Sequence, residues 1–185
     1  GATELMKELN YVLYLENAAS TLMASVWAKG EQAAIDWVDS FPEGKARNSA
    51  YKALGKRLIR EDIGRAVEWV DSMDESEIKT KIARETAEAM VILSPKKAAD
   101  WVARMPVGEA RSASMERVVS EWVEQDPAAT AEWLNQFPND QSIDGALAIF
   151  AHEVAEKQPQ SALQWAQSIE DSERRERVIQ YVKNK

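Results

Sequence analysis

A constant interval between tryptophans is the feature that most constrains what this chain can fold into. Five of its seven Trp residues are separated by steps of 32 residues. Self-similarity at such a period is typical of repeat proteins, in which each repeat is one supersecondary element. We number the repeats so that the tryptophan is the seventh residue, and the repeats are then 31–62, 63–94, 95–126, 127–158 and a shortened 159–185, with Trp37, Trp69, Trp101, Trp133 and Trp165.

The first half of each repeat has the pattern of an amphipathic helix, which we call helix A. Small or apolar residues recur at repeat positions 4, 5, 7, 8 and 11, and this spacing forms one face of an α-helix. We expect about eleven residues in helix A. Its start is marked by N-cap residues and by proline at the first helical position, which are Asp62, Ser94 and Asp126, and Pro95, Pro127 and Pro159.

The second half of each repeat predicts another helix, helix B, of about fifteen residues. Residues that favour N-caps stand at position 14, and a second apolar stripe follows at positions 20, 21, 24 and 28. Each repeat is therefore expected to be an αα-hairpin. The position-14 residues are Gly44, Ser76, Gly108, Asp140 and Ser172.

Residues 1–30 fit the same frame as a degenerate N-terminal repeat. Leu5 takes the tryptophan position and Leu9 takes position 11, and the stripe of helix B is matched by Ala18, Ala19, Leu22 and Val26. The run 11–15 is more apolar than its counterparts, and we expect it to cover the end of the stack; a partner or an upstream repeat is the alternative. The chain opens with Gly1-Ala2-Thr3 and no Met, which suggests a processed end or a tag scar.

A single hairpin cannot bury its two apolar stripes, whereas stacked hairpins share a continuous core. The sequence therefore predicts an all-α protein with one α-solenoid domain over residues 1–185. We expect a right-handed α-α superhelix of about six helix-turn-helix repeats. Within it the periodic tryptophans are expected to be core anchors and not an exposed aromatic platform.

Composition excludes several classes of function. The absence of Cys excludes disulfides, Cys-ligated zinc, iron–sulfur clusters and thiol catalysis, and the single His152 excludes zinc sites with several His ligands. A net charge of −8 argues against nucleic acid as a partner. No apolar run approaches the ~18–20 residues that cross a membrane, so we expect no membrane insertion. Because no phosphate-binding loop or calcium loop occurs either, we expect no cofactor, no metal and no catalytic residue.

The segment from Asp126-Pro127 to Trp133 resembles the entry to a tetratricopeptide repeat, in which a proline also precedes the helix A tryptophan by six residues. The resemblance implies a tetratricopeptide-like α-solenoid, a class that commonly holds a segment of a partner protein. The departures are a repeat shorter by two residues and large residues four positions after the tryptophan, which are Phe41, Met73, Met105, Phe137 and Ile169. The resemblance therefore implies the architecture and no site residue.

An acidic row follows the helices A, off their apolar faces. Its members stand one position before or two positions after the tryptophan, and they are Asp36, Asp39, Glu68, Asp71, Asp100 and Glu132. These carboxylates predict a groove that binds a basic or amide-rich extended partner. The alternative is a solvated face whose acids suit the first half of a helix.

A basic ridge occupies the first helix B. Between Glu43 and Arg65 lie seven basic and three acidic residues, a local charge of +4, so the rest of the chain carries −12. This ridge could dock an acidic partner or another copy of the chain, which makes self-association possible. The alternative is that its cations pair with nearby carboxylates and select nothing.

The sequence favours a non-catalytic scaffold that binds a protein or a peptide. One alternative is a structural spacer module of a larger bacterial or secreted protein, and another is a hydrolase that uses paired carboxylates as general acid and base. The cellular compartment is not indicated by the residues.

Overall fold

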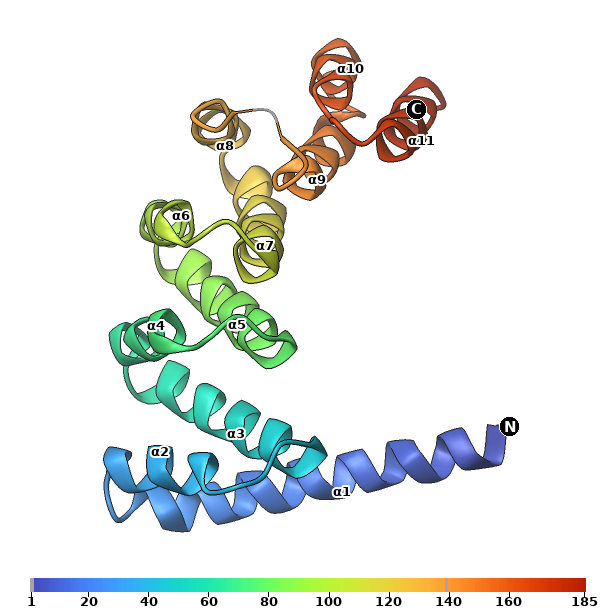
Figure 1. Ribbon diagram of the computed structural model, residues 1–185. Coiled ribbons are helices and arrows are strands. Elements are labelled where there is room, and N and C mark those ends of the chain that lie inside the picture. Colours follow the sequence, from blue (N-terminus) through green and yellow to red (C-terminus); the bar gives the residue numbers. More distant parts are fainter. Residues whose placement is uncertain (1, 139) are drawn as a thin grey trace. The chain divides into compact units, whose positions relative to one another are not determined.

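A computed structural model describes the backbone of residues 2–138 and 140–185, and it describes the side chains of these residues except 2–10 and 12. The described part of the chain is all-helical (Figure 1). The helices are α1 (Ala2–Trp27), α2 (Glu31–Asp39), α3 (Lys45–Glu61), α4 (Ile63–Ser72), α5 (Glu77–Leu93), α6 (Pro95–Arg104), α7 (Glu109–Gln125), α8 (Pro127–Leu134), α9 (Asp144–Val154), α10 (Pro159–Gln167) and α11 (Ser172–Lys183).

The helix boundaries agree with the repeat frame. Helices α2, α4, α6, α8 and α10 begin at residues 31, 63, 95, 127 and 159, the first residues of the predicted repeats, and they are the A helices. The other helices are the B helices. The A helices have 8 to 10 residues and α3, α5 and α7 have 17 each, so the predicted order of a short and a longer helix is confirmed.

Local chemistry explains these boundaries. Asp62 accepts hydrogen bonds from the backbone N–H groups of Gly64 and Arg65, at 2.8 and 3.3 Å, and Asp126 accepts one from Ala129 at 3.0 Å. The expected N-cap carboxylates therefore satisfy backbone donors that a helix leaves free in its first turn. Pro95, Pro127 and Pro159 occupy the first turns of their helices, as expected.

Two boundaries differ from the prediction. Helix α9 begins at Asp144 and not near Asp140, because Asp140 instead accepts a 2.8 Å bond from the backbone N–H of Ser142 and holds a turn. The cap of α11 is Asp171, whose carboxylate accepts from the N–H of Arg174 at 2.6 Å, so Ser172 is already helical.

The N-terminal segment also differs from the prediction. Residues 2–27 form one helix of 26 residues where the degenerate repeat implied a hairpin. No proline or glycine interrupts this segment, so the backbone hydrogen bonds of α1 continue through the expected turn. The side chains of Leu5 and Leu9 lie outside the described residues. Tyr11, Leu13 and Tyr14 are exposed, so they do not cover the end of a stack.

The chain forms two compact bodies, Gly1–Val70 and Asp71–Lys185. In the N-terminal body, α1 packs on α2 and α3, and α2 packs on α3. Their shared core contains Met23, Val38, Leu54 and Leu58, with Trp37 and Trp69 half-buried against it. The continuity of a solenoid across the two bodies stays a prediction.

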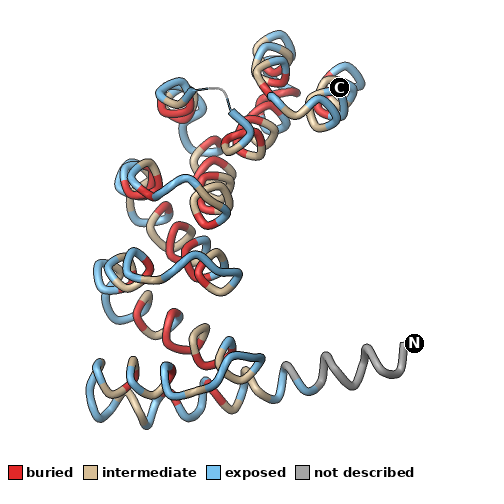
Figure 2. The backbone as a smooth tube through the Cα atoms, viewed as in Figure 1, coloured by how far each residue is buried: buried red, intermediate tan, exposed pale blue. Residues whose placement is uncertain are grey.

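In the C-terminal body the B helices pack on each other in chain order, α5 on α7, α7 on α9 and α9 on α11. The A helices α6, α8 and α10 each pack on the B helix before and the B helix after. Much of the surface of α7 is therefore buried (Figure 2). Its residues Ser114, Met115, Val118 and Val119 are 0% exposed. The buried Ser114 hydroxyl donates to the carbonyl of Ala110 at 2.7 Å, so this polar group is satisfied within its helix.

Polar side chains tie successive hairpins of this body together. Asp144 is only 1% exposed, and its two carboxylate oxygens accept from the backbone N–H groups of Glu170 and Asp171 at 2.8 and 2.7 Å. Ser112 makes a comparable bond from α7 to the carbonyl of Ser142 at 2.9 Å. Each of these two side chains therefore fixes the loop between helices A and B of the repeat that follows its own in the chain.

The periodic tryptophans occupy the core to different degrees. Trp101 and Trp133 are buried, whereas Trp37, Trp69 and Trp165 are half-buried. None of them is exposed, which favours the expectation that they act as core anchors. Among the described residues, no helix is long and apolar enough to cross a membrane.

We predict that Trp101→Ala lowers the free energy of unfolding by about 3–5 kcal/mol, because the substitution leaves a cavity at a side chain that is 2% exposed. Urea unfolding followed by circular dichroism measures the change. Trp165→Ala is the matched control and should cost less, since Trp165 is half-buried. An unchanged midpoint for Trp101→Ala would contradict the core assignment.

Candidate functional site

The acidic row is exposed, but several of its carboxylates already have partners. In the N-terminal body, Asp36 accepts a hydrogen bond from the side-chain amide of Gln32 at 2.8 Å. Asp39 accepts from the hydroxyl of Tyr51, and Arg47 donates to the same hydroxyl oxygen at 3.2 Å. The phenol is therefore held between a carboxylate and a guanidinium. Burial raises the pKa of Tyr51, and the bond to Asp39 raises this pKa further.

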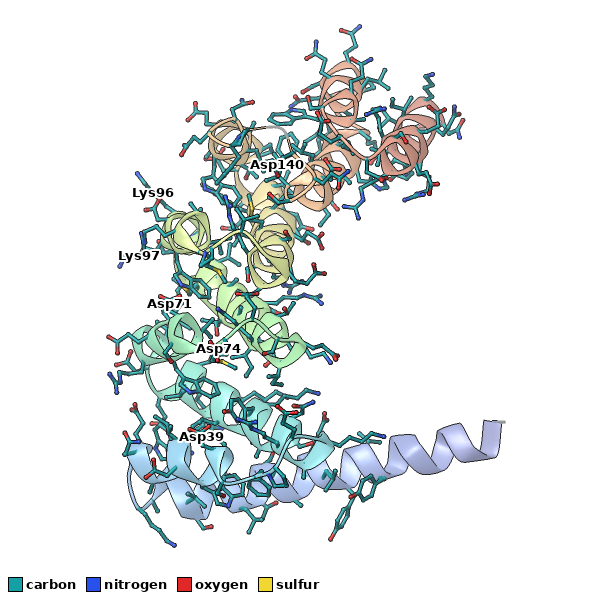
Figure 3. All side chains as sticks on the ribbon, viewed as in Figure 1. Asp39, Asp71, Asp74, Lys96, Lys97 and Asp140 are labelled. Carbon is teal, nitrogen blue, oxygen red and sulfur yellow. The ribbon has the colours of Figure 1, made fainter. Side chains whose placement is uncertain are left out.

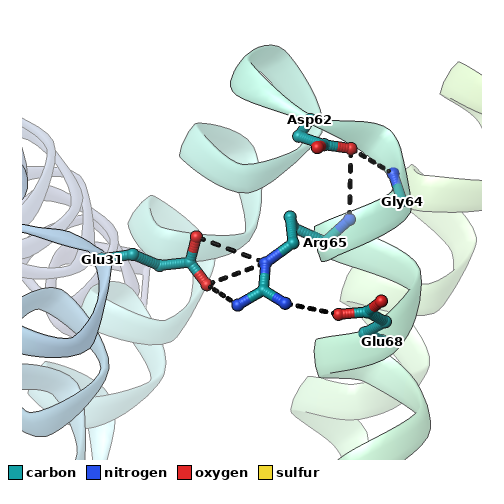
Figure 4. Close-up of polar contacts among 5 residues, drawn as sticks. All are labelled: Glu31, Asp62, Gly64, Arg65 and Glu68. Carbon is teal, nitrogen blue, oxygen red and sulfur yellow. Dashed lines mark hydrogen bonds and ion pairs between the residues drawn. The ribbon is translucent and has the colours of Figure 1, made fainter.

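Glu68, the third acidic residue of this body, belongs to an ion-pair network (Figure 4). The guanidinium of Arg65 contacts Glu68 at 2.6 Å and Glu31 at 2.6 Å. Its bond to Glu31 is the first cause of a raised Arg65 pKa. Because Arg65 and Glu68 are exposed and Glu31 is only half-buried, the network contributes little stability, but it neutralises part of the predicted acidic face.

In the C-terminal body, Asp71 has a structural partner. Its carboxylate accepts a 3.0 Å hydrogen bond from the indole N–H of Trp101 in the next repeat. Asp100 and Glu132 are exposed, and no side-chain partner is present for either of them among the described residues. Lys96 and Lys97 project from the start of α6, the same helix as Asp100 (Figure 3). The A-helix face of this body therefore carries charges of both signs, and its role in binding a basic partner stays a prediction.

The basic ridge of α3 is largely paired. Lys52 contacts Glu16 at 2.7 Å, and Arg57 contacts Glu61 at 2.9 Å while its guanidinium lies 5.3 Å from the centre of the Trp27 ring. These contacts favour the interpretation in which the cations of the ridge pair with neighbouring groups.

Among the buried polar atoms without a hydrogen-bond partner in the described part of the chain is the indole N–H of Trp133, and a change in the repeat pattern explains it. Trp133 is 4% exposed, and its indole N–H has no hydrogen-bond acceptor. The bond from Trp101 to Asp71 joins residues 30 apart, and the residue 30 before Trp133 is Ala103. The missing carboxylate at position 9 of the preceding repeat, 95–126, therefore explains the unpaired indole of Trp133.

The described residues contain an open groove of about 360 Å³ on the B-helix side of the C-terminal body. Helix α9 forms the floor, with Gly145, Ala148, Ile149 and His152 at successive helical steps on one face. Helix α7 contributes Glu116, and α11 contributes Arg174, Arg177 and Val178.

The groove exists because α9 departs from the repeat pattern. At the positions of Gly145, Ala148, Ile149 and His152, helix α5 has the long charged residues Lys81, Arg84, Glu85 and Glu88. Short and apolar side chains on α9 thus leave open a channel that long charged side chains would cover. Gly145 has a direct steric role: a Cβ there would lie 1.8 Å from Oε1 of Glu116, so the glycine admits this carboxylate against α9.

The groove is lined by cationic side chains from α11 and by an acidic side chain from α7. Arg174 has no carboxylate partner among the described side chains, and Arg177 makes only an exposed contact of 3.7 Å with Glu173. His152 stacks on Tyr181 with ring centres 4.0 Å apart. Partial burial lowers the pKa of His152, an effect that Glu153 opposes. The groove therefore offers two guanidinium groups beside an apolar floor, with one carboxylate opposite.

The sequence contained signals for some of these features that the periodic apolar pattern did not reveal. Position 17 is basic in four repeats, with Arg47, Lys79, Arg111 and Arg175. Lys79 donates to the carbonyl of Met73 at 2.8 Å and Arg175 to that of Ile169 at 2.6 Å, each just after an A helix. These cations satisfy carbonyl groups at the ends of A helices. The groove residues could have been found from the loss of charge on the outer face of α9.

Comparison with known proteins assigns no relative: no family model, no curated protein and no solved structure matches the chain. Within the described residues, no group of three or more His, Asp or Glu side chains is arranged to hold a metal ion.

We predict that Ala103→Asp raises the free energy of unfolding by about 1 kcal/mol, because it restores an acceptor for the buried indole N–H of Trp133. The variant Ala103→Asn offers an acceptor without a charge near the end of α6. Urea unfolding measures the stability, and the NMR shift of the Trp133 indole proton reports the new bond. If neither variant shifts that proton, the missing carboxylate at residue 103 does not explain the unpaired indole of Trp133.

We predict that His152 titrates below the value of about 6.5 that is usual for histidine, since burial disfavours its charged form. The folded state then binds a proton at His152 less readily than the unfolded chain does. The neutral imidazole therefore contributes its stability in full above the unfolded pKa, and this contribution is lost as the pH falls through the lower pKa of the folded state. NMR titration is direct because the chain has a single histidine. Tyr181→Ala, which removes the stacked ring, should move the pKa upward; an unchanged value would show that the ring does not cause the shift.

Proposed function

We propose that this chain is a non-catalytic helical-repeat scaffold that binds a peptide segment of a partner protein. In this proposal the hairpins form a tetratricopeptide-like α-solenoid, a right-handed α-α superhelix. The proposal is supported by the agreement between helix boundaries and the sequence period, and by the packing of helices on their chain neighbours inside each of the two bodies. Such architectures usually present extended binding surfaces.

The observation that carries the binding proposal is the groove between α7, α9 and α11. It is open and lined by four residues of α9, and it arises where the repeat loses its charged outer residues. An apolar floor with a few charged groups at its edges is typical of a site that accepts side chains of a peptide. The pair Arg174 and Arg177 recognises a carboxylate by charge-assisted hydrogen bonds, and Glu116 lies opposite for an amide or ammonium group. We therefore propose a ligand with an acidic group next to a small apolar side chain.

A second candidate is capture of a basic partner by the A-helix face. Asp100 and Glu132 favour it, because both are exposed and have no partner among the described side chains. The nearby Lys96 and Lys97 oppose it. The spacer and hydrolase alternatives have no comparable feature in their support.

The test is a selection of random peptides on the immobilised protein, followed by fluorescence anisotropy of the enriched peptides. We expect enriched sequences to combine Asp, Glu or a free C-terminal carboxylate with a small apolar residue. Ala148→Arg should weaken their binding at least tenfold, because the long side chain would fill the channel; Arg84 stands at the matching position of α5. Binding should also raise the pKa of His152 if a carboxylate approaches it.

Gln180→Arg is the matched control. It places the same residue at the same repeat position on α11, at an exposed site outside the groove lining, and it should leave affinity unchanged. Asp100→Lys with Glu132→Lys tests the A-helix face in the same assay. Peptides that bind wild type and Ala148→Arg equally would contradict the groove as the binding site, and loss of binding in the A-face variant alone would favour the second candidate.

A further inference from the structure

Helix α1 carries an apolar face that no described side chain covers. One side of the helix packs on α3 through Ala19 and Met23, which are buried. A neighbouring stripe contains Tyr14 and Leu22, which are 69% and 52% exposed, with Ala18 between them. Large apolar side chains at such exposure mark an interaction surface when they are contiguous.

The repeat period identifies what kind of surface this is. Tyr14, Ala18 and Leu22 stand 96 residues before Ala110, Ser114 and Val118 of α7, which is three repeats of 32. All three α7 residues are 0% exposed, because the neighbouring helices of the C-terminal body cover them. The exposed stripe of α1 is therefore the helix-packing side of a B helix, and its natural occupant is another helix.

The charge pattern distinguishes α1 from the helix at the other end of the chain. Residues 17–28 contain no charged residue. Glu16, just before them, contacts Lys52 at 2.7 Å. In contrast, α11 is rich in charge, with Glu173, Arg174, Arg175, Glu176, Arg177 and Lys183. A polar outer face is typical of a capping helix. A head-to-tail contact of α1 with α11 of another copy would bury these charges against apolar side chains, which is costly.

The stripe of α1 is instead complementary to itself. Tyr14 and Leu22 lie four residues before and after Ala18, and Tyr11 and Ser25 lie seven residues before and after it. Two antiparallel copies that cross at Ala18 would place Tyr14 of one opposite Leu22 of the other. The small side chain of Ala18 lets the two backbones approach at the crossing. The one charged residue between Tyr14 and Leu22 is Glu16, which contacts Lys52 of its own chain.

We infer that the chain forms a homodimer through an antiparallel pair of α1 helices centred on Ala18. The contact is isologous, with the same patch on both copies, as most symmetric dimers have. None of the residues in this contact belongs to the groove on α9.

Sedimentation velocity over a concentration series tests the dimer. Wild type should reach twice the mass of a single chain, and Leu22→Lys should remain monomeric at concentrations where wild type is dimeric. Leu13→Lys is the matched control: Leu13 is as exposed as Leu22 on the same helix, and nine residues at about 100° each place it on the opposite side. Circular dichroism verifies that both variants are folded. A wild type that stays monomeric at every concentration, or a Leu13→Lys variant that dissociates as Leu22→Lys does, overturns the inference.

Cysteine cross-linking tests the register, because the native chain has no Cys. Under oxidising conditions Ala18→Cys should form a disulfide dimer, and Leu13→Cys should not. A mixture of Tyr14→Cys and Leu22→Cys chains should cross-link more efficiently than either variant alone, as the antiparallel pairing requires. Preferential cross-linking of Tyr14→Cys to itself would indicate a parallel pair and overturn the proposed geometry.

Discussion

The packing of each longer helix against two others is the interaction on which the C-terminal body depends. Helix α7 is enclosed by α5 and α6 on one side and by α8 and α9 on the other, and its buried residues extend around more than one face. A hairpin taken alone would expose one of these faces, so no repeat in such a body is stable without its neighbours. This need for a neighbour on each side explains the 32-residue period, because each repeat must present the same two packing faces at the same spacing.

The features that obey this requirement could be predicted from the sequence. The starts of the A helices, the N-caps at Asp62 and Asp126 and the order of short and longer helices all follow from local periodicity and turn chemistry. The roles of Asp39 and Asp71 could not be predicted in the same way. A carboxylate off the apolar face of a helix looks solvated in the sequence, but its partner, Tyr51 or Trp101, comes from a later helix. Such a tertiary contact is visible only after the helices are packed.

The α1 segment shows a second limit of the repeat frame. Its apolar spacing predicts a helix B, and the burial of Ala19 and Met23 agrees with this prediction. The turn expected before it does not form, because no proline or glycine there breaks the helix. No helix of the described part of the chain covers Tyr14 and Leu22, which are exposed. A period therefore predicts which residues are suited to a contact, but it does not supply the element that makes the contact.

Departures from the period carry more functional information than the period itself. Where the pattern loses a structural carboxylate, at Ala103, the result is an unpaired indole and no accessible site. Where it loses long charged side chains, at Ala148 and Ile149, the result is a groove with unpaired arginine beside it. The difference is in what the lost side chain did: the first change removes the acceptor of a buried indole N–H, while the second removes charged side chains from the outer face of a helix and leaves space there. A change that selection need not resist on grounds of folding is free to serve recognition, and for that reason the outer face of α9 is a better place to seek a binding function than the tryptophan ladder.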